Sequence, residues 1–153
     1  MNTSTFPPEF VQRMQTLMNN GELKLPPPIF TEMGGEMVEL DMAAKTLIVR
    51  FPVQERFQNP MGYMQGGMIA AAIDNAIGPL SFMVAAPSVT KSLAVQYLRP
   101  ISAKNKQITV VAAFESEHER ELTFVADVLR DDGAKLAQAR SVNILLKRKR
   151  SHQ

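Results

Sequence analysis

Alternating apolar and polar positions fill the second half of the chain and predict a series of β-strands. Side chains of a strand point by turns to the two faces of a sheet, so a two-residue period marks a half-buried strand. The pattern predicts strands at Val89 to Arg99, Lys106 to Glu115, Glu121 to Arg130 and Lys135 to Lys147. Asp132-Gly133 is a strong hairpin signal, and Glu117 to Arg120 indicates a looser turn. Strands joined by short turns predict an antiparallel sheet.

The segment Gly66 to Ala86 has a different pattern, because it is apolar on nearly all sides. Such a pattern predicts a buried helix, and its many alanines allow close approach of other backbone. Pro79 cannot donate a hydrogen bond to the carbonyl of Asn75, so we expect a kink or an interruption there.

Residues 5–20 predict a further helix at the N-terminal end. Thr5 is a capping residue, prolines follow in the first turn, and Asn19-Asn20-Gly21 ends the segment. Its apolar residues recur at helical spacing at Phe10, Met14, Leu17 and Met18. The run Pro26-Pro27-Pro28 predicts an extended connector.

Two shorter strands are predicted next, at Met33 to Met42 and Lys45 to Val53, with Ala43-Ala44 at the turn between them. Together the elements predict an α+β architecture, with a curved antiparallel sheet wrapped around the long helix and an extra helix at the N-terminal end. No repeat or shift of composition marks a boundary, so residues 1–153 are expected to form one domain.

The composition excludes several classes of site. The chain has 153 residues, of which 45% are hydrophobic and 21% charged, as in ordinary folded proteins. It has no cysteine, which excludes disulfides, thiolate zinc sites, iron–sulfur clusters and cysteine nucleophiles. The first ten residues lack the basic residues and apolar run of a signal peptide, and we expect no membrane span. A cytoplasmic location is therefore predicted.

Charge gives little support for a nucleic-acid partner. The net charge is +2 and the pI is about 9.0, but four of the 17 basic residues form the run Lys147 to Arg150. The rest of the chain has 13 basic against 15 acidic residues. The basic tail, residues 147–153, is interpreted as a solvated end, and an adaptor for nucleic acid or membrane ranks last among the functions.

Familiar cofactor signatures are missing from the sequence. The two histidines, His118 and His152, lack metal-ligand spacing. The sequence contains no P-loop, dinucleotide fingerprint or nucleophile elbow. No metal or redox cofactor is therefore expected.

The segment Asn59 to Gly67, which runs into the long helix, is the most informative part of the sequence. Two glycines at the start of a helix expose unpaired N–H groups that can bind an oxyanion. Asp74 is the only ionisable residue of the helix, and we expect it to be buried with the helix. An isolated buried carboxylate is costly and is a candidate general base. The alternative is that Asp74 pairs with a Lys or Arg of the sheet, while the glycines only permit tight packing. The residues alone leave the two interpretations about equal.

This segment resembles the active-site segment of hotdog-fold acyl-CoA thioesterases of the phenylacetyl-CoA thioesterase-like (PaaI-type) branch. That family has an Asn, His-Gly-Gly six residues later, and an acidic residue seven positions after the last glycine. Asn59, Gln65-Gly66-Gly67 and Asp74 have the same spacing. The stretch Thr90 to Pro100 resembles the family's strand after the helix, and the resemblance covers roughly Met33 to Leu146. It implies a hotdog fold and hydrolysis of an acyl-CoA thioester.

The resemblance also implies roles for single residues. Asp74 would be the general base or the nucleophile, the Gly66 amide would polarise the thioester carbonyl, and Asn59 would orient the water or the thioester. Thr90 would assist the water, with Ser92 on the same strand face as the second choice.

Two further positions are weaker matches to the family. Arg120 aligns with a basic position that can meet the CoA phosphates. Gln65 replaces the histidine of the family, and its amide can form hydrogen bonds but cannot titrate near neutral pH.

The resemblance further implies a homodimer, or a dimer of dimers, because the family builds each site from two subunits. Asp74 would come from one subunit, and Asn59 and Gly66 from the other. The competing hypothesis is a non-catalytic acyl-CoA-binding hotdog protein. The acyl group stays open between aryl and medium-chain groups, because methionines near the motif either line a pliable pocket or fill the core.

Overall fold

The computed structural model describes residues 6–19 and 25–147 and is α+β, as the sequence predicts. The expected cap at Thr5 and most of the basic tail lie outside these residues. In chain order the elements are α1 (Pro8–Asn19), α2 (Pro28–Glu32), β1 (Glu36–Asp41), β2 (Thr46–Pro52), the 3-10 turn η2 (Glu55–Phe57), α3 (Gly66–Val84), β3 (Ser88–Tyr97), β4 (Gln107–His118), β5 (Glu121–Leu129) and β6 (Lys135–Leu145).

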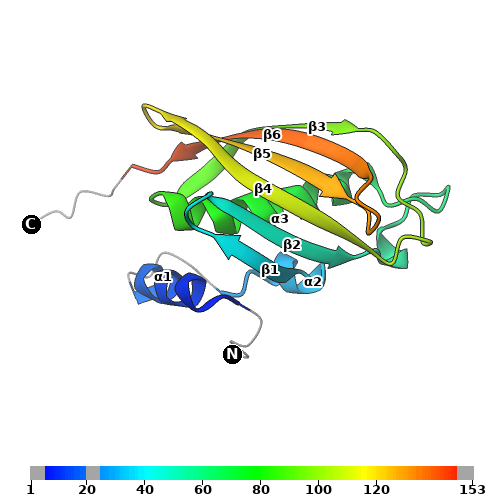
Figure 1. The fold of residues 1–153 in the computed structure, drawn as a ribbon, viewed down its shortest axis with the longest axis horizontal. Coiled ribbons are helices and arrows are strands. Elements are labelled where there is room, and N and C mark those ends of the chain that lie inside the picture. Colours follow the sequence, from blue (N-terminus) through cyan, green and yellow to red (C-terminus); the bar gives the residue numbers. More distant parts are fainter. Residues whose placement is uncertain (1–5, 20–24, 148–153) are drawn as a thin grey trace, which may run out of the picture.

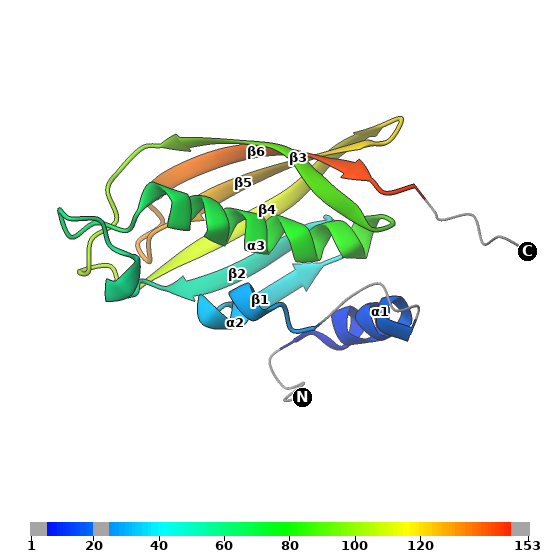
Figure 2. The same cartoon turned by 180° about the vertical axis from the view of Figure 1, so that it is seen from behind.

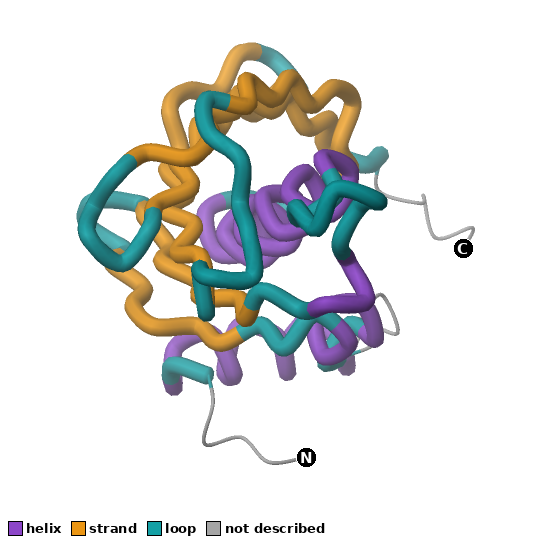
Figure 3. Tube along the Cα trace, turned by 90° about the vertical axis from the view of Figure 1, so that its right-hand side faces the viewer, coloured by secondary structure: helices purple, strands orange, loops and turns teal. Residues whose placement is uncertain are grey.

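The six strands form one antiparallel sheet in the order β1-β2-β4-β5-β6-β3. Figures 1 and 2 show that the sheet curves around α3, and Figure 3 shows the same wrapping from the end. β3 follows α3 directly in the chain, yet it lies at the edge of the sheet and pairs only with β6. One backbone edge of β3 is therefore unpaired in the single chain.

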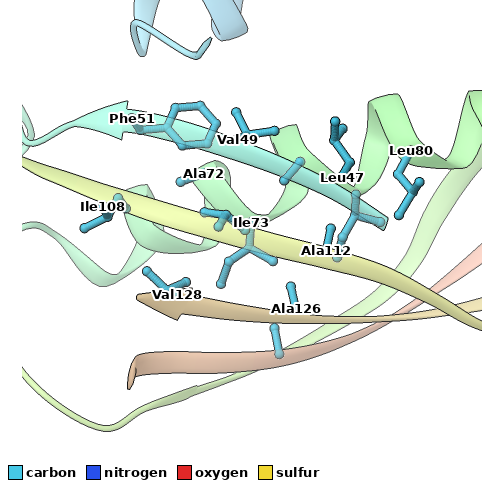
Figure 4. Packing of buried hydrophobic residues seen from close by; sticks show 14 of the residues in the cluster. Leu47, Val49, Phe51, Ala72, Ile73, Leu80, Ile108, Ala112, Ala126 and Val128 are labelled. Atoms are coloured by element: carbon cyan, nitrogen blue, oxygen red, sulfur yellow. The ribbon is translucent and has the colours of Figure 1, made fainter. Parts of the chain in front are cut away.

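The core lies between α3 and the concave face of the sheet (Figure 4). The expected alternation is confirmed in the first half of β4 and along the whole of β5, where every second residue is buried. The helix contributes a fully buried stripe, Ala72, Ile73, Ala76, Ile77 and Leu80. Each large aliphatic side chain buried in this way stabilises the fold by roughly 1.5–3 kcal/mol. This packing places α3, and any group on its margins, at a fixed position against the sheet.

Helix α3 differs from the sequence prediction in two respects. It continues through Pro79 from Gly66 to Val84, so the expected interruption is not seen. It is also long and apolar enough by composition to cross a membrane, the one such helix in the described part of the chain. Its apolar character is explained by its place as the core helix, since seven of its residues are buried.

The connections show smaller differences. The proline run is not wholly extended, because Pro28 begins α2 and Pro27 is its N-cap; proline suits the first helical position since its φ is already helical. The β4–β5 turn is tighter than expected, with two residues between the strands, and Glu119 has φ 55°. The hairpin at Asp132-Gly133 is confirmed, with φ 84° at Gly133.

Helix α1 packs below the C-terminal half of α3 in the view of Figure 2. Its apolar residues Phe10, Met14 and Leu17 are buried, which confirms the predicted amphipathic helix. Arg13 donates from Nε to the carbonyl of Phe82 (3.1 Å) and from Nη2 to that of Ala85 (3.2 Å). A cation at the last carbonyls of a helix also meets the negative end of its dipole. Arg13 therefore anchors α1 to the end of α3.

Candidate active site

The N-terminus of α3 presents two unused backbone donors. Gln65 is the N-cap residue, and its carbonyl accepts from the amides of Met68 (2.8 Å) and Ile69 (3.1 Å). The amides of Gly66 and Gly67 donate to no protein acceptor within the described residues. Unpaired N–H groups at the positive end of a helix are suited to a developing oxyanion.

Tyr97, at the end of β3, positions this helix start. Its hydroxyl donates to the carbonyl of Gly66 at 2.8 Å. A Cβ atom added to Gly66 would lie 3.3 Å from Tyr97 Cζ, so the glycine permits the ring to approach. No role for Tyr97 was predicted from the sequence, although its inward place in the alternation of β3 was a usable signal.

Asn59 organises the loop before α3. Its side-chain Oδ1 accepts from the amides of Met61 (3.0 Å) and Tyr63 (3.1 Å), and its own amide donates to the carbonyl of Tyr63 (2.7 Å). The Gln65 amide then donates to the carbonyl of Phe57 at 2.8 Å, which ties the loop to the helix start. The oxygen of Asn59 is engaged in the loop, so its NH2 group is the part of the side chain that can serve a substrate.

Asp74 lies on a different part of α3, beside the edge strand. Thr90 of β3 donates from Oγ1 to Asp74 Oδ1 at 2.9 Å, so the structure brings these two predicted residues together. Asp74 is exposed in the single chain, and the expectation that it is buried is wrong. The carboxylate sits on the flank of α3 next to the sheet edge, outside the buried stripe. Within the described residues it forms no ion pair with a Lys or Arg, so the pairing expected in the alternative interpretation is not seen.

A β-bulge decides between the two candidate hydroxyl residues of β3. The register shifts between Thr90, which pairs with Asn143, and Ser92, which pairs with Val142. Residues directly opposite in a sheet share a face, and the buried Asn143 points inward. Thr90 therefore faces the helix and Ser92 faces away. The expectation that they share a face is wrong, because the bulge inserts one residue and reverses the alternation.

Gly66 and Asp74 are too far apart in one chain to act on the same atom. Eight residues of helix correspond to about 12 Å along the axis, whereas reacting groups must come within ~3 Å of the shared atom. The two residues also contact β3 at different points, Gly66 at Tyr97 and Asp74 at Thr90. In a single chain the structure does not unite the oxyanion donors with the carboxylate.

Gln65 and Arg120 are both exposed. The side chain of Gln65 does not cap α3. Arg120 lies in the β4–β5 turn and donates from Nη2 to the carbonyl of Leu145, while its own carbonyl accepts from the Leu145 amide at 2.8 Å. This contact holds the end of β6 against the turn, and a contact with CoA phosphates stays a prediction.

Comparisons with known proteins find similar folds among solved structures. No protein-family model and no curated protein sequence matches the chain significantly. A candidate thioesterase, a phenylacetic acid degradation-related protein from Ralstonia eutropha JMP134, has 26% identity and a TM-score of 0.74, over 85% of this chain and 98% of that chain. The PaaI protein of the E. coli phenylacetic acid degradation operon has 14% identity and a TM-score of 0.76, over 91% and 94% of the two chains.

A third similar structure carries a ligand. It is a Streptococcus mutans protein bound to acetyl-CoA, with 19% identity and a TM-score of 0.70, over 84% of this chain and 97% of that chain. Each of the three matches covers at least 84% of this chain, in which a curved sheet surrounds one long helix. The chain therefore has the hotdog fold, and its structural neighbours are candidate thioesterases of the PaaI type.

Proposed function

We propose that this protein hydrolyses an acyl-CoA thioester to the free carboxylic acid and CoA. The observation that carries the proposal is the hydrogen bond between Thr90 and Asp74, on the same helix as the unused amides of Gly66 and Gly67. A carboxylate for water activation and donors for an oxyanion are the two requirements of thioester hydrolysis. Acetyl-CoA on the S. mutans neighbour supports the substrate class.

In the proposed reaction the Gly66 amide donates to the thioester carbonyl oxygen. Asp74 takes a proton from a water molecule as the oxygen of that water attacks the carbonyl carbon, and Thr90 orients the carboxylate. The tetrahedral intermediate then collapses, the carbon–sulfur bond breaks, and the proton passes to the sulfur of CoA. Direct attack by the carboxylate, through an anhydride that water then opens, is the other form of the same proposal.

The separation of about 12 Å along α3 implies that each site uses two chains, with Asp74 from one subunit and Gly66 and Asn59 from the other. The unpaired edge of β3 supports association, because a free strand edge is a template for pairing with another chain. Val89, Tyr97 and Leu98, on or just after that strand, are 48%, 50% and 43% exposed in the single chain. A homodimer, or a dimer of dimers, is therefore part of the proposal.

The test is release of thiol from a panel of acyl-CoA esters. The chain has no cysteine, so a thiol reagent reports CoA without a background from the protein. Asp74→Asn keeps the size of the side chain and removes the proton acceptor, and turnover should fall by about 100-fold or more. An unchanged circular dichroism spectrum and melting temperature would control for folding, and turnover near wild type in the folded variant would contradict the proposal.

The alternative, a non-catalytic acyl-CoA-binding protein, predicts binding of the same esters with no release of thiol. Gln65 in place of the family histidine is the feature that favours it. The independence from metal and redox cofactors and the cytoplasmic location stay predictions, as does the absence of a nucleic-acid partner.

A further inference from the structure

A cavity of about 330 Å³ lies between α1 and the C-terminal half of α3. One wall comes from α1 with Phe10, Val11 and Met14, and the opposite wall comes from α3. Figure 2 shows α1 next to α3, on the side of α3 that the sheet leaves open. Apolar side chains form most of the lining, which also includes Phe6, Phe30 and Phe82.

The α3 wall begins at the proposed catalytic carboxylate. Asp74, Gly78 and Phe82 follow one another at four-residue spacing, which places them in one stripe along the helix. Among the residues that the structure describes, Asp74 is the only charged residue of the lining. The cavity therefore has one charged end, at the group proposed to activate water, and an apolar interior beyond it.

Gly78 leaves room in the middle of this wall. A Cβ atom built at Gly78 would meet no atom within 4 Å, and the residue lies inside a helix, where glycine costs about 1 kcal/mol relative to alanine. The opposite wall is held in place, because Arg13 of α1 donates to the last carbonyls of α3. The cavity therefore results from the missing side chain at Gly78 and from the way α1 packs on α3.

The size and lining suit an apolar group of several carbons. An apolar cavity of roughly 150 Å³ is enough to bind benzene, and this cavity is about twice as large. Ligand pockets of this kind are mostly apolar, with a few polar groups that fix orientation. Burial of a charged or strongly polar group here would find few hydrogen-bond partners and would be costly.

We infer that the cavity between α1 and α3 receives the acyl group of the substrate, and that this group is uncharged, apolar and several carbons long. This inference rests on the proposed function for the place of the thioester. The carbonyl lies at Asp74, the acyl group extends past Gly78 toward Phe82, and the CoA moiety extends away from α1. Helix α1 then determines the length of acyl group that the protein accepts.

The test is binding of S-alkyl-CoA thioethers, which have no carbonyl and cannot be hydrolysed. Calorimetric titration would compare S-ethyl-CoA with S-hexyl-CoA and S-octyl-CoA. Each buried methylene raises affinity by about four-fold, so burial of about four of the additional methylenes makes S-octyl-CoA bind at least ~100-fold more tightly than S-ethyl-CoA. Equal affinity for the ethyl and octyl compounds would overturn the inference.

Gly78→Leu places a side chain in the middle of the cavity and should lower the affinity for S-octyl-CoA by about ten-fold or more, with a change below about two-fold for S-ethyl-CoA. Gln12→Leu is the matched control, because it adds the same side chain at an exposed position of α1 outside the lining, and it should change neither affinity. Gly78→Ala adds one methyl group without a close contact and should have the same selectivity to a smaller extent. Equal losses for both thioethers in the Gly78 variants would overturn the inference.

The two proposals fail separately. Hydrolysis of short and long acyl-CoA esters at equal efficiency would support the proposed function and overturn the assignment of this cavity. Strong preference for long thioethers in a protein that releases no thiol would support the cavity and favour the non-catalytic alternative.

Discussion

Two inactive variants should restore activity when they are combined in one dimer. Gly66→Pro removes one proposed oxyanion donor, because proline has no N–H. Gly66 is the first residue of α3, where proline is favoured, and Gln65 before it has φ −58° and ψ 135°, which a residue before proline prefers. Gly66→Ala is the matched control, since it keeps the N–H and brings the same Cβ near Tyr97.

The expected losses follow from the chemistry assigned to each group. Removal of one oxyanion donor costs about 10²- to 10³-fold in kcat, or roughly 3–4 kcal/mol. Asp74→Asn should cost about 10²-fold or more, and Gly66→Ala should keep most of the activity. Each variant alone is therefore nearly inactive in both sites of its homodimer.

A mixed dimer of Gly66→Pro and Asp74→Asn distinguishes a shared site from a site within one chain. If Asp74 and Gly66 of one site come from different chains, one site of the mixed dimer is intact and the other carries both changes. Dimers purified through two different tags should then have about half of the wild-type kcat per dimer. Thiol release is the assay, and a folded mixed dimer no more active than either homodimer would refute the argument from the separation along α3.

Three other changes test single contacts. Thr90→Val removes the hydrogen bond to Asp74 and should lower kcat roughly ten-fold, whereas Ser92→Val on the opposite face should change kcat little. Equal effects would contradict the conclusion that the bulge turns Thr90 toward α3 and Ser92 away from it. Gln65→Ala should raise the activation free energy by about 1–3 kcal/mol, less than Asp74→Asn does, and Gln65→His should stay active. A loss of kcat in Gln65→Ala as complete as that in Asp74→Asn would show that the division of roles is wrong. The hydrogen bond from Arg130 lowers the pKa of Asp132 to about 2, so Asp132 stabilises the fold above the unfolded pKa near 4 and loses this effect as pH falls through about 2. Asp132→Asn should therefore lower the urea midpoint slightly at pH 6, with the difference vanishing near pH 2, and a constant difference would count against this ion pair.

Much of the secondary structure could be predicted from local patterns in the sequence. The alternation Ile108, Val110 and Ala112 is buried in β4 as expected, since a two-residue period makes one face of a strand apolar. Asp132-Gly133 forms its turn because glycine adopts the positive φ that the hairpin requires. The long apolar helix was recognisable as a core helix because a helix without a polar face needs cover on every side.

The tertiary structure decided the features on which the candidate site depends. The place of β3 at the edge depends on pairing between β3 and β6, far apart in the chain, and no local pattern contains that pairing. The bulge that turns Thr90 toward Asp74 and Ser92 away is a property of the register with β6, so a regular two-residue period misplaces Ser92. The exposure of Asp74 in the single chain follows from which face of α3 packs on the sheet, since Ala72, Ile73 and Ala76 occupy that face and are buried.

The spacing of Asn59, Gly66 and Asp74 is visible in the sequence, and its resemblance to a family pointed to thioester chemistry. The cavity between α1 and α3 is not visible there, because it depends on Arg13 reaching the carbonyls of Phe82 and Ala85 about 70 residues away. Local sequence thus determined which elements form and which chemical groups they carry, since propensity and periodicity act over a few residues. Contacts between distant segments decided which groups meet and what space remains between them, because packing is a property of the assembled core.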